Sequence, residues 1–600
     1  MSQAIEDYAL IGDCFTAGLV GVDGCLDWLC LPRFDSPSVF GSLLGDEDDG
    51  RWLLTPTDAD ATSERRYDGA GFTLVTHWTT PTGEVEVTDV MPIGRGRVDV
   101  VRRVRGLAGS VELRQEVRFR FDYGATVPWV SQNRDRDPVE LVAIAGPNAV
   151  VLRGPAVRGH DHQHSGTFTV SEGETVDLVL TWFPSHRSLP VPLDVDAALE
   201  HTAQWWQDWL DRGTHDDDPR ALPDRYGDLV LRSLLVLRAL THESTGGIAA
   251  AATTSLPEQF GGSRNWDYRF VWLRDAALTI HVLARHEFQD EVDRWRRWML
   301  RAIAGDPADV QIMYGLGGER WLPERELSSL AGYQGASPVR VGNAASEQFQ
   351  ADVIGEVMLA FSAARDAGLE DDAVSWGLQR ALLGHLEKVW EQPDQGIWEI
   401  RGEARAFTHS RAMSWAAFDR GVEAVEKHGL HGPARRWAEL RDSIRRAIDQ
   451  NHVDTATSAF VQYAGAVHVD AALLQLPQIG FCAPDDPRML ATVAQIEAEL
   501  VHDGFVDRYV SGSGVDGLPA GENPFTACSL WLAEQYARSG RRDDAVALID
   551  RVAGIANDLG LLSEEYDPVA KRQAGNTPQA LSHLAFVRAV DALSDAEMTR

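Results

Sequence analysis

The 600-residue sequence lacks a long hydrophobic run and an N-terminal targeting segment. No apolar stretch approaches the roughly 18 residues that a helix needs to cross a bilayer. Residues 1–8 (MSQAIEDY) contain neither the basic region nor the apolar region of a secretory signal. We therefore expect no membrane partner and predict a cytoplasmic location.

Cysteine and basic residues are also scarce. The cysteines are odd in number and lack metal-ligand spacing, so we expect reduced, mostly buried thiols. They are Cys14, Cys25, Cys30, Cys482 and Cys528. The excess of Asp and Glu over Lys and Arg gives a net charge of −34. Because such a surface repels phosphate backbones and anionic lipid, we expect no nucleic-acid partner and a neutral substrate.

Motifs for nucleotides and catalytic metals are missing as well. The Gly-rich segment 332–343 (GYQGASPVRVGN) has neither the GxxxxGK[ST] nor the GxGxxG spacing of phosphate-binding loops. The sequence contains no HExxH motif and no close Cys/His cluster. We therefore predict no cofactor and no metal.

Residues 1–195 are rich in short runs of β-branched and aromatic residues that alternate with polar ones. Gly, Pro and Asp turns separate the runs at intervals typical of an antiparallel β-sandwich. The clearest runs are 72–78, 85–90, 98–104, 111–119 and 175–182. We predict an N-terminal β-sandwich domain here.

The hydrophobic period changes to that of helices at about residue 195. Residues 198–210 predict a connecting helix inside a linker at 196–223, and about a dozen helical segments follow within 224–600. The main ones are 226–242, 272–286, 288–304, 346–367, 371–391, 409–428, 432–452, 485–501, 524–540, 542–558 and 577–594. Without a fixed-period repeat, this pattern favours a closed helical toroid whose loops converge on one site.

The densest polar and aromatic cluster lies at residues 263–275. It contains Tyr268 and Trp272, followed by Arg274 and Asp275 at the start of a helical pattern. Arg and Asp can hydrogen-bond sugar hydroxyls while an aromatic wall holds the apolar face of the ring; the alternative is a helix cap with an ion pair. The density of aromatics favours a sugar clamp.

Candidate acid and base residues come from distant segments. Glu399 follows Trp398 in a loop at 396–402, and the adjacent Glu564 and Glu565 lie in 560–567. Two carboxyl groups are the minimum for hydrolysing a glycosidic bond. Packing against an indole would favour the protonated form of Glu399, as a general acid requires. The alternatives are solvated loop glutamates, and we expect at most one of the adjacent pair to be the base.

Further polar residues are ambiguous. Arg340, Asn343 and Asp352 lie in and after the Gly-rich loop, where binding and structural roles are equally open. His583 falls on the last helical segment, and we interpret it as a packed, hydrogen-bonded residue rather than a ligand.

These segments, in this order, resemble glycoside hydrolase family 15, the family of glucoamylases and bacterial trehalases. Residues 7–13 (DYALIGD) and 23–40 (DGCLDWLCLPRFDSPSVF) are similar to the opening of its prokaryotic members. The resemblance implies a multidomain β + α protein in which an N-terminal antiparallel β-sandwich precedes an (α/α)6 barrel. It also implies that Glu399 is the general acid and Glu564 the general base. In many glucoamylases a Gln stands where this chain has Glu565.

The resemblance further implies an inverting, exo-acting α-glucoside hydrolase that releases β-glucose from non-reducing ends. Glu399 would protonate the glycosidic oxygen while Glu564 deprotonates water across a gap of roughly 6.5–9.5 Å. The predicted substrate-binding residues are Tyr268, Trp272, Arg274, Asp275, Trp398, Arg340 and Glu565.

The substrate and the oligomeric state stay open at this point. Trehalose, malto-oligosaccharides and isomalto-oligosaccharides are all compatible, although the missing secretion signal disfavours extracellular starch. The alternative functions are an inverting glycoside phosphorylase, which would replace the base with a phosphate pocket, and a non-catalytic sugar-binding protein. A homo-oligomer is compatible with the sequence.

Overall fold

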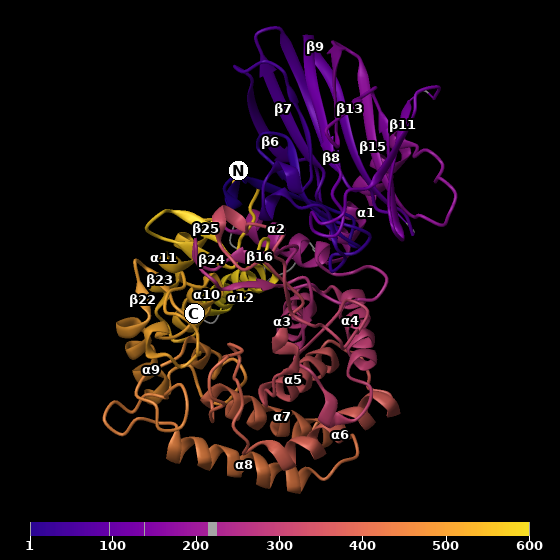
Figure 1. Ribbon diagram of the computed structural model, residues 1–600. Coiled ribbons are helices and arrows are strands. Elements are labelled where there is room, and N and C mark those ends of the chain that lie inside the picture. Colours follow the sequence, from indigo (N-terminus) through magenta and orange to yellow (C-terminus); the bar gives the residue numbers. More distant parts are fainter. Residues whose placement is uncertain (1, 95, 137, 214–224, 599–600) are drawn as a thin grey trace.

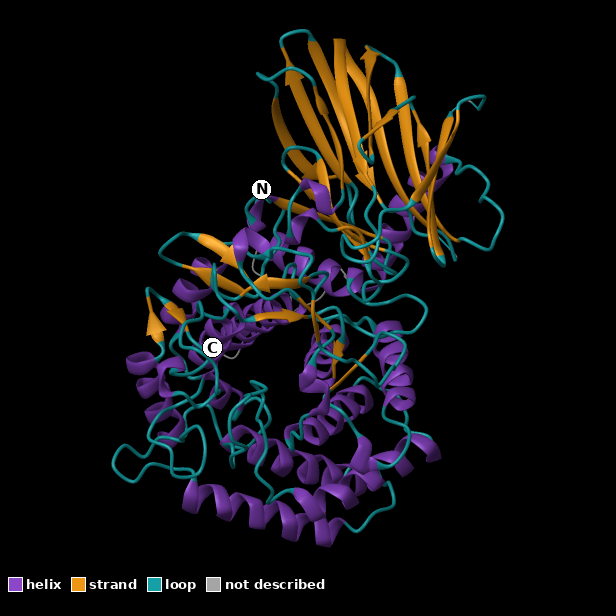
Figure 2. Ribbon diagram, viewed as in Figure 1, coloured by secondary structure: helices purple, strands orange, loops and turns teal. Residues whose placement is uncertain are grey.

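The computed structural model describes residues 2–94, 96–136, 138–213 and 225–598. Strands gather in the N-terminal part and helices form a ring in the remainder (Figures 1 and 2). This arrangement confirms the predicted β-sandwich followed by a helical toroid. The predicted boundary between linker and barrel at residues 223 and 224 lies outside the described residues.

Antiparallel pairing joins the strands of the N-terminal domain. They are β1 (Tyr8–Gly12), β2 (Ala17–Gly21), β3 (Cys25–Cys30), β4 (Ser38–Phe40), β5 (Arg51–Pro56), β6 (Thr62–Tyr67), β7 (Leu74–Thr80), β8 (Gly83–Val90), β9 (Val98–Arg118), β10 (Trp129–Asn133), β11 (Val139–Ala145), β12 (Asn148–Gly154), β13 (Arg158–His160), β14 (Gln163–Ser171) and β15 (Thr175–Pro184).

Strand β9 corrects one expectation. The runs 98–104 and 111–119 were expected to be separate strands, but they form one strand of 21 residues. Gly106 and Gly109 do not end it, because the strand changes partners there: its first half pairs with β8 and β15, and its second half pairs with β5 and β14. The absence of a side chain at Gly106 lets the Ser171 carbonyl approach closely, so glycine serves a crossover between sheets rather than a turn.

The predicted helices are confirmed throughout the described chain. They are α1 (Val195–Gly213), α2 (Gly227–Ala239), α3 (Leu273–Arg285), α4 (Gln289–Ala302), α5 (Asp352–Asp366), α6 (Ala373–Val389), α7 (Thr408–Glu426), α8 (Ala434–Asn451), α9 (Pro487–Glu499), α10 (Thr526–Arg538), α11 (Arg542–Ala553) and α12 (Ala580–Met598). Helix α1 is the predicted connection.

Short pairs of antiparallel strands lie in the loops between these helices. They are β16 (Thr254–Pro257) with β17 (Asn265–Asp267), β18 (Val271–Trp272) with β19 (Met313–Tyr314), β20 (Arg325–Glu326) with β21 (Arg340–Val341), β22 (Val501–His502) with β23 (Phe505–Val506), and β24 (Glu565–Asp567) with β25 (Arg572–Ala574).

The helices form two concentric layers (Figure 1). In the described chain, α3, α5, α7, α10 and α12 make the inner ring, and α2, α4, α6, α8, α9 and α11 lie outside it. The remaining inner position holds a short 3-10 helix, η7 (Ala471–Gln475), between α7 and α10. Burial follows these positions: the outer helix α8 buries one stripe of residues three and four apart, whereas the inner helix α10 is buried nearly all round.

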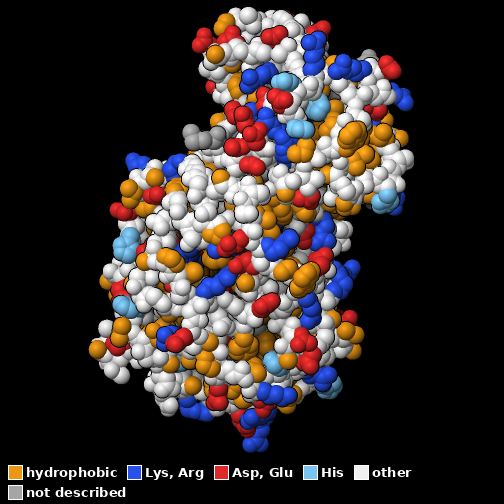
Figure 3. Space-filling view, in the orientation of Figure 1, with side chains coloured by type: hydrophobic (Ala, Val, Ile, Leu, Met, Phe, Trp, Pro, Cys, Tyr) orange, Lys and Arg blue, Asp and Glu red, His pale blue; other side chains and the backbone are white. Residues whose placement is uncertain are grey.

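Charged side chains of both signs are interspersed over the helical part of the face in Figure 3. Ion pairs join charged side chains of the helical domain, such as Arg488 with Asp449 at 2.6 Å. All five cysteines are buried free thiols, as expected.

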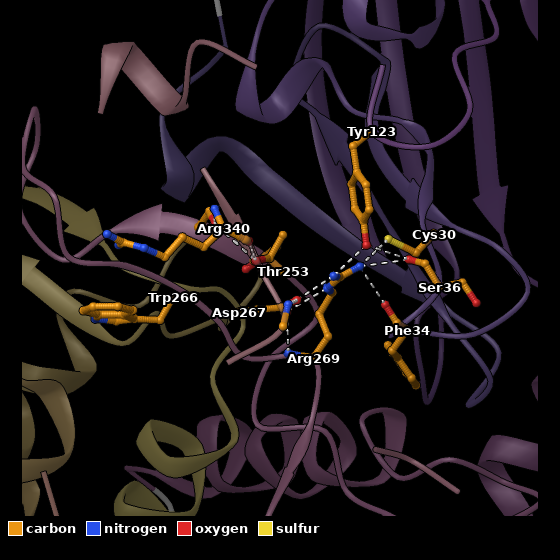
Figure 4. Close-up of polar contacts among 12 residues, drawn as sticks. Cys30, Phe34, Ser36, Tyr123, Thr253, Trp266, Asp267, Arg269 and Arg340 are labelled. Carbon is orange, nitrogen blue, oxygen red and sulfur yellow. Dashed lines mark hydrogen bonds and ion pairs between the residues drawn. The ribbon is translucent and has the colours of Figure 1, made fainter. Parts of the chain in front are cut away.

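Arg269 links the two domains (Figure 4). It lies between β17 and α3 and is 1% exposed. Its guanidinium pairs with Asp267 at 2.7 Å. It also donates to the Ser36 carbonyl at 2.9 Å and to the Tyr123 hydroxyl at 2.8 Å, both in the N-terminal domain. One buried cation therefore satisfies groups on both sides of the domain boundary.

Replacing Arg269 by Met should destabilise the protein by about 3–5 kcal/mol, because the fully buried Asp267 carboxylate loses its partner. Thermal unfolding followed by circular dichroism measures the loss. Arg297→Met is the matched control, since Arg297 pairs with Asp293 at the surface with its side chain 69% exposed, and it should leave the unfolding temperature unchanged. Equal unfolding temperatures for both variants would contradict this account of the domain contact.

Candidate active site

A pocket opens at the N-terminal ends of the inner helices. Trp272 precedes α3, Glu399 lies in the loop before α7, and Phe525 precedes α10. Helix N-termini carry partial positive charge, so their convergence favours carboxylates and oxygen-rich ligands. The lining residues include Ala250, Glu258, Arg264, Trp266, Tyr268, Trp272, Arg274, Asp275, Asn343, Ile397, Trp398, Glu399, Arg401, Arg508, Tyr509, Asp516, Phe525 and Gln579.

Glu399 is held by the aromatic cluster and by the predicted clamp. Its Oε1 accepts a hydrogen bond from Trp272 Nε1 at 2.6 Å and lies 3.7 Å from Arg274 Nη1. Burial raises the pKa of the carboxyl, while Arg274 and Trp272 oppose that shift. The backbone at Glu399 has a φ of 57°, a left-handed conformation that a non-glycine residue seldom adopts. The fold therefore constrains this residue closely.

Arg274 and Asp275 occupy the first turn of α3. Arg274 Nε donates to Asp275 Oδ1 at 2.7 Å, and Arg274 Nη1 donates to the Ile397 carbonyl at 2.8 Å. Tyr268 contacts Trp272 edge to face, with the ring centroids 5.2 Å apart. These side chains line one wall, which gives the pocket both an ion pair and an aromatic surface.

Trp398, next to Glu399 in the same loop, is held by contacts with other parts of the inner ring. Its Nε1 donates to the Asp470 carboxylate at 2.8 Å, at the start of η7. Its ring packs against Phe525 and Trp531. The loop that carries Glu399 is thus attached to two further inner positions of the ring.

Glu564 is fully buried behind the pocket wall. Its Oε2 accepts from the Asn576 amide at 3.3 Å, and its Oε1 has no hydrogen-bond partner among the described residues. Burial and the nearby Glu258 raise the pKa of this carboxyl, and Arg508 and Tyr268 oppose the shift. Glu564 is not itself among the lining residues, whereas Tyr268 is. Its unpartnered oxygen suits the binding of a water molecule.

Helix α12 holds the segment that carries Glu564. His583 Nε2 accepts from the Leu562 amide at 3.1 Å, and Ser582 Oγ donates to the Ser563 carbonyl at 2.8 Å. His583 Nδ1 also contacts Ser233 Oγ at 2.9 Å. This confirms the prediction of a packed, hydrogen-bonded histidine, and burial lowers its pKa to about 3, so the ring is neutral.

Glu565 has different surroundings from Glu564. Its Oε2 accepts from the Asn523 amide at 3.2 Å, and its Oε1 lies 3.6 Å from Arg508. It does not line the pocket but lies against Arg508, which does. The structure thus gives the two adjacent carboxyls separate partners.

Arg340 also lies behind the pocket wall. Its guanidinium lies 4.6 Å from the ring centre of Trp266 (Figure 4), and its Nη1 donates to the Ser263 carbonyl at 2.8 Å. Trp266 lines the pocket and Arg340 does not. Of the other ambiguous residues, Asn343 lines the pocket, and Asp352 begins α5, fully enclosed in the protein.

A buried charge cluster in the pocket was missed in the sequence. Arg508 donates to Glu258 at 2.7 Å and to Glu522 at 2.8 Å, and Trp266 Nε1 donates to Glu258 at 3.1 Å. These residues come from separate loops and follow no motif spacing. The nearest signal was Arg508 beside Tyr509, whereas Glu258 and Glu522 have no adjacent aromatic residue.

In the described part of the chain, no group of three or more His, Cys, Asp or Glu side chains is placed to hold a metal ion. None of the described helices combines the length and the apolar character needed to cross a bilayer.

The family model "Glycosyl hydrolases family 15" matches residues 224–591, and "Trehalase-like, N-terminal" matches residues 1–181. A trehalase of Mycobacterium tuberculosis is 34% identical over 98% of this chain and 89% of its own. A trehalase of Thermoplasma volcanium is 31% identical over 99% and 94%. A bacterial glucoamylase complexed with acarbose shares the fold, with a TM-score of 0.71 and 12% identity over 99% and 94% of the two chains.

Proposed function

The chain belongs to glycosyl hydrolase family 15, and from this membership we propose that it is a trehalase, an α-glucoside hydrolase that cleaves trehalose with inversion. The choice of trehalose as the substrate rests on the curated relatives named trehalase, which match nearly the whole chain, including its N-terminal domain. The net charge of −34 suits a neutral disaccharide.

In the proposed mechanism, Glu399 is the general acid. Its raised pKa keeps a proton available for the glycosidic oxygen, and Trp272 and Arg274 fix the orientation of the carboxyl. As the bond breaks, the leaving oxygen takes the proton and Glu399 becomes an anion. Arg274, 3.7 Å away, then stabilises the new charge.

Glu564 is the proposed general base. Its unpartnered Oε1 accepts a proton from a water molecule, which attacks the anomeric carbon on the face opposite the leaving group. The Asn576 amide orients the other oxygen at 3.3 Å. Arg274 and Asp275 hold hydroxyls of the non-reducing glucose, and Tyr268, Trp272 and Trp398 enclose its ring. Arg340 and Glu565 support Trp266 and Arg508 from behind.

Glu399→Gln and Glu564→Gln should each lower kcat by about 10²–10⁴-fold with unfolding temperatures unchanged, because each removes one proton-transfer step. Initial rates of glucose release measure the loss. Glu403→Gln is the matched control, since that carboxylate lies in the same loop but is 87% exposed. Near-normal activity in either pocket variant would remove that residue from the mechanism.

The pH profile follows from the two raised pKa values. The active form needs Glu564 ionised and Glu399 protonated, so the kcat/KM profile is bell-shaped, and its two limbs belong to the pair of carboxyls rather than to either residue alone. Burial moves both limbs of the kcat/KM profile to higher pH than the ordinary glutamate value of about 4.3.

Glu258→Gln should shift the kcat/KM profile to lower pH, because it removes a neighbouring carboxylate that raises the pKa of Glu564. The profile of the parent enzyme, measured with trehalose, is the reference. A parent profile whose acid limb lies near pH 4, or a profile that Glu258→Gln leaves in place, would contradict this assignment.

Among trehalose, maltose, maltotriose and isomaltose, trehalose should give the highest kcat/KM for glucose release in phosphate-free buffer. Polarimetry or NMR of the fresh product should show one β-glucose and one α-glucose per trehalose, since inversion changes only the attacked anomeric carbon. Two α-glucoses would refute inversion, a phosphate requirement as co-substrate would indicate a phosphorylase, and a preference for maltotriose would indicate a glucoamylase.

A further inference from the structure

Another cavity lies in the barrel, away from the predicted acid and base. Its volume is about 440 Å³, against about 50 Å³ for the pocket that Glu399 lines. It runs along the inner helices toward their C-terminal ends, where Arg285 of α3 and Arg538 of α10 lie. Ile397 lines both spaces.

The cavity exists because the helix at one position of the inner ring is short. Helix η7 has 5 residues where α3 has 13 and α7 has 19, and the segment after it, including Pro477 and Gly480, forms one side of the cavity. A full helix at this position would extend alongside α7 and α10. The cavity is therefore a consequence of the backbone path rather than of a few small side chains.

The charged side chains around this cavity are paired with one another. Arg285 contacts Asp591 at 3.0 Å, and Glu534 contacts Arg538 at 2.9 Å and Arg588 at 3.4 Å. Because these charges are compensated within the protein, the wall offers a charged ligand no unpaired partner of opposite sign among these side chains.

Buried polar atoms without a partner lie on the same wall. His409 Nδ1 and Gln475 Nε2 have no hydrogen-bond partner among the described residues. Glu356, His409 and Gln475 are each 4% exposed, and His409 Nδ1 comes no closer than 3.8 Å to Asp352. His281, which also lines the cavity, is exposed. Leaving buried polar atoms unsatisfied in a protein interior is costly, which points to an occupant.

Burial favours the uncharged form of the titratable groups in this set. It lowers the pKa of His409 to about 3 and raises the pKa of Glu356 well above its usual range. A neutral imidazole, a carboxylic acid and an amide each offer both a donor and an acceptor. A hydroxyl group also donates and accepts, so it matches all of them.

We propose that this cavity is a second, non-catalytic binding site for a neutral mono- or disaccharide. Its volume falls within the range of small-molecule sites. An apolar ligand would leave His409 Nδ1 and Gln475 Nε2 without partners, and an ion would meet no free counter-charge among the ion pairs described above. The inference does not depend on which glucoside the enzyme cleaves.

Equilibrium dialysis with labelled trehalose and labelled glucose tests the proposal. The full-length Glu399→Gln chain, which should not consume trehalose, is expected to bind two sugars. Adding His281→Trp places an indole in the cavity and should reduce the number to one. Adding Val374→Trp instead, at a position 74% exposed on α6, is the matched control and should leave two sugars bound per chain.

His281→Trp in the otherwise unchanged enzyme should retain the parent kcat, which verifies that the chain still folds. If it does not fold, Glu356→Met removes a polar group at similar volume and should weaken the second binding event at least tenfold. One bound sugar in Glu399→Gln, which would mean a cavity filled by water, overturns the proposal. So does a second site that persists unchanged in both cavity variants.

Discussion

Burial of carboxyl groups at one end of the helical ring is the constraint on which the rest of the structure depends. Glu258, Glu399, Glu564 and Glu565 all lie at the N-terminal ends of the inner helices. Removing a carboxylate from water costs several kcal/mol unless a partner compensates it. Arg508 serves Glu258 and Glu565, and Arg274 faces Glu399, but burial outweighs these partners and raises the pKa of all four carboxyls. Burial at this end of the ring therefore favours the protonated form of each carboxyl, and the arginines limit that shift.

The N-terminal domain helps to maintain this arrangement. Arg572 of β25, which pairs with the strand that follows Glu564, contacts Glu6 at 2.6 Å. Asn557, just upstream, donates to the carbonyls of Glu6 and Tyr8 at 3.1 and 3.0 Å. Since α12 holds the same segment from the other side, the Glu564 loop is fixed between the last helix and the first strand of the chain. A sandwich domain remote from the pocket therefore contributes to its precision.

The sequence predicted most of the helices because their burial is periodic. Along α8, Trp437, Leu440, Ile444 and Ile448 recur at three- and four-residue intervals. The same reasoning could not find η7, whose five residues are all buried and show no period. The same reasoning divided β9 into two strands at Gly106 and Gly109, where in the folded protein the strand changes the strands with which it pairs.

The pocket was predictable to the extent that its residues are clustered in the sequence. Tyr268, Trp272, Arg274 and Asp275 are close neighbours along the chain, and the structure keeps them on one wall. Glu258 and Arg508 lie 250 residues apart and meet only through the closure of the ring. Their mutual compensation is a tertiary property, which local pattern could not reveal.

The dipoles of the inner helices influence which side chains are favoured at each end of the barrel. An acidic residue occupies the first turn of α3 and of α5, and an arginine occupies the last turn of α3, α5 and α10, in agreement with the helix dipole. The helix dipoles thus favour carboxyls at the end where the acid and base are proposed and guanidiniums at the other. The arginines must be neutralised in turn, and Asp591 and Glu534 do so. The buried polar atoms left without partners there belong to the His409 imidazole, whose neutral form burial favours, and to the Gln475 amide. One end of the barrel is therefore suited to acid–base chemistry and the other to recognition of a neutral ligand.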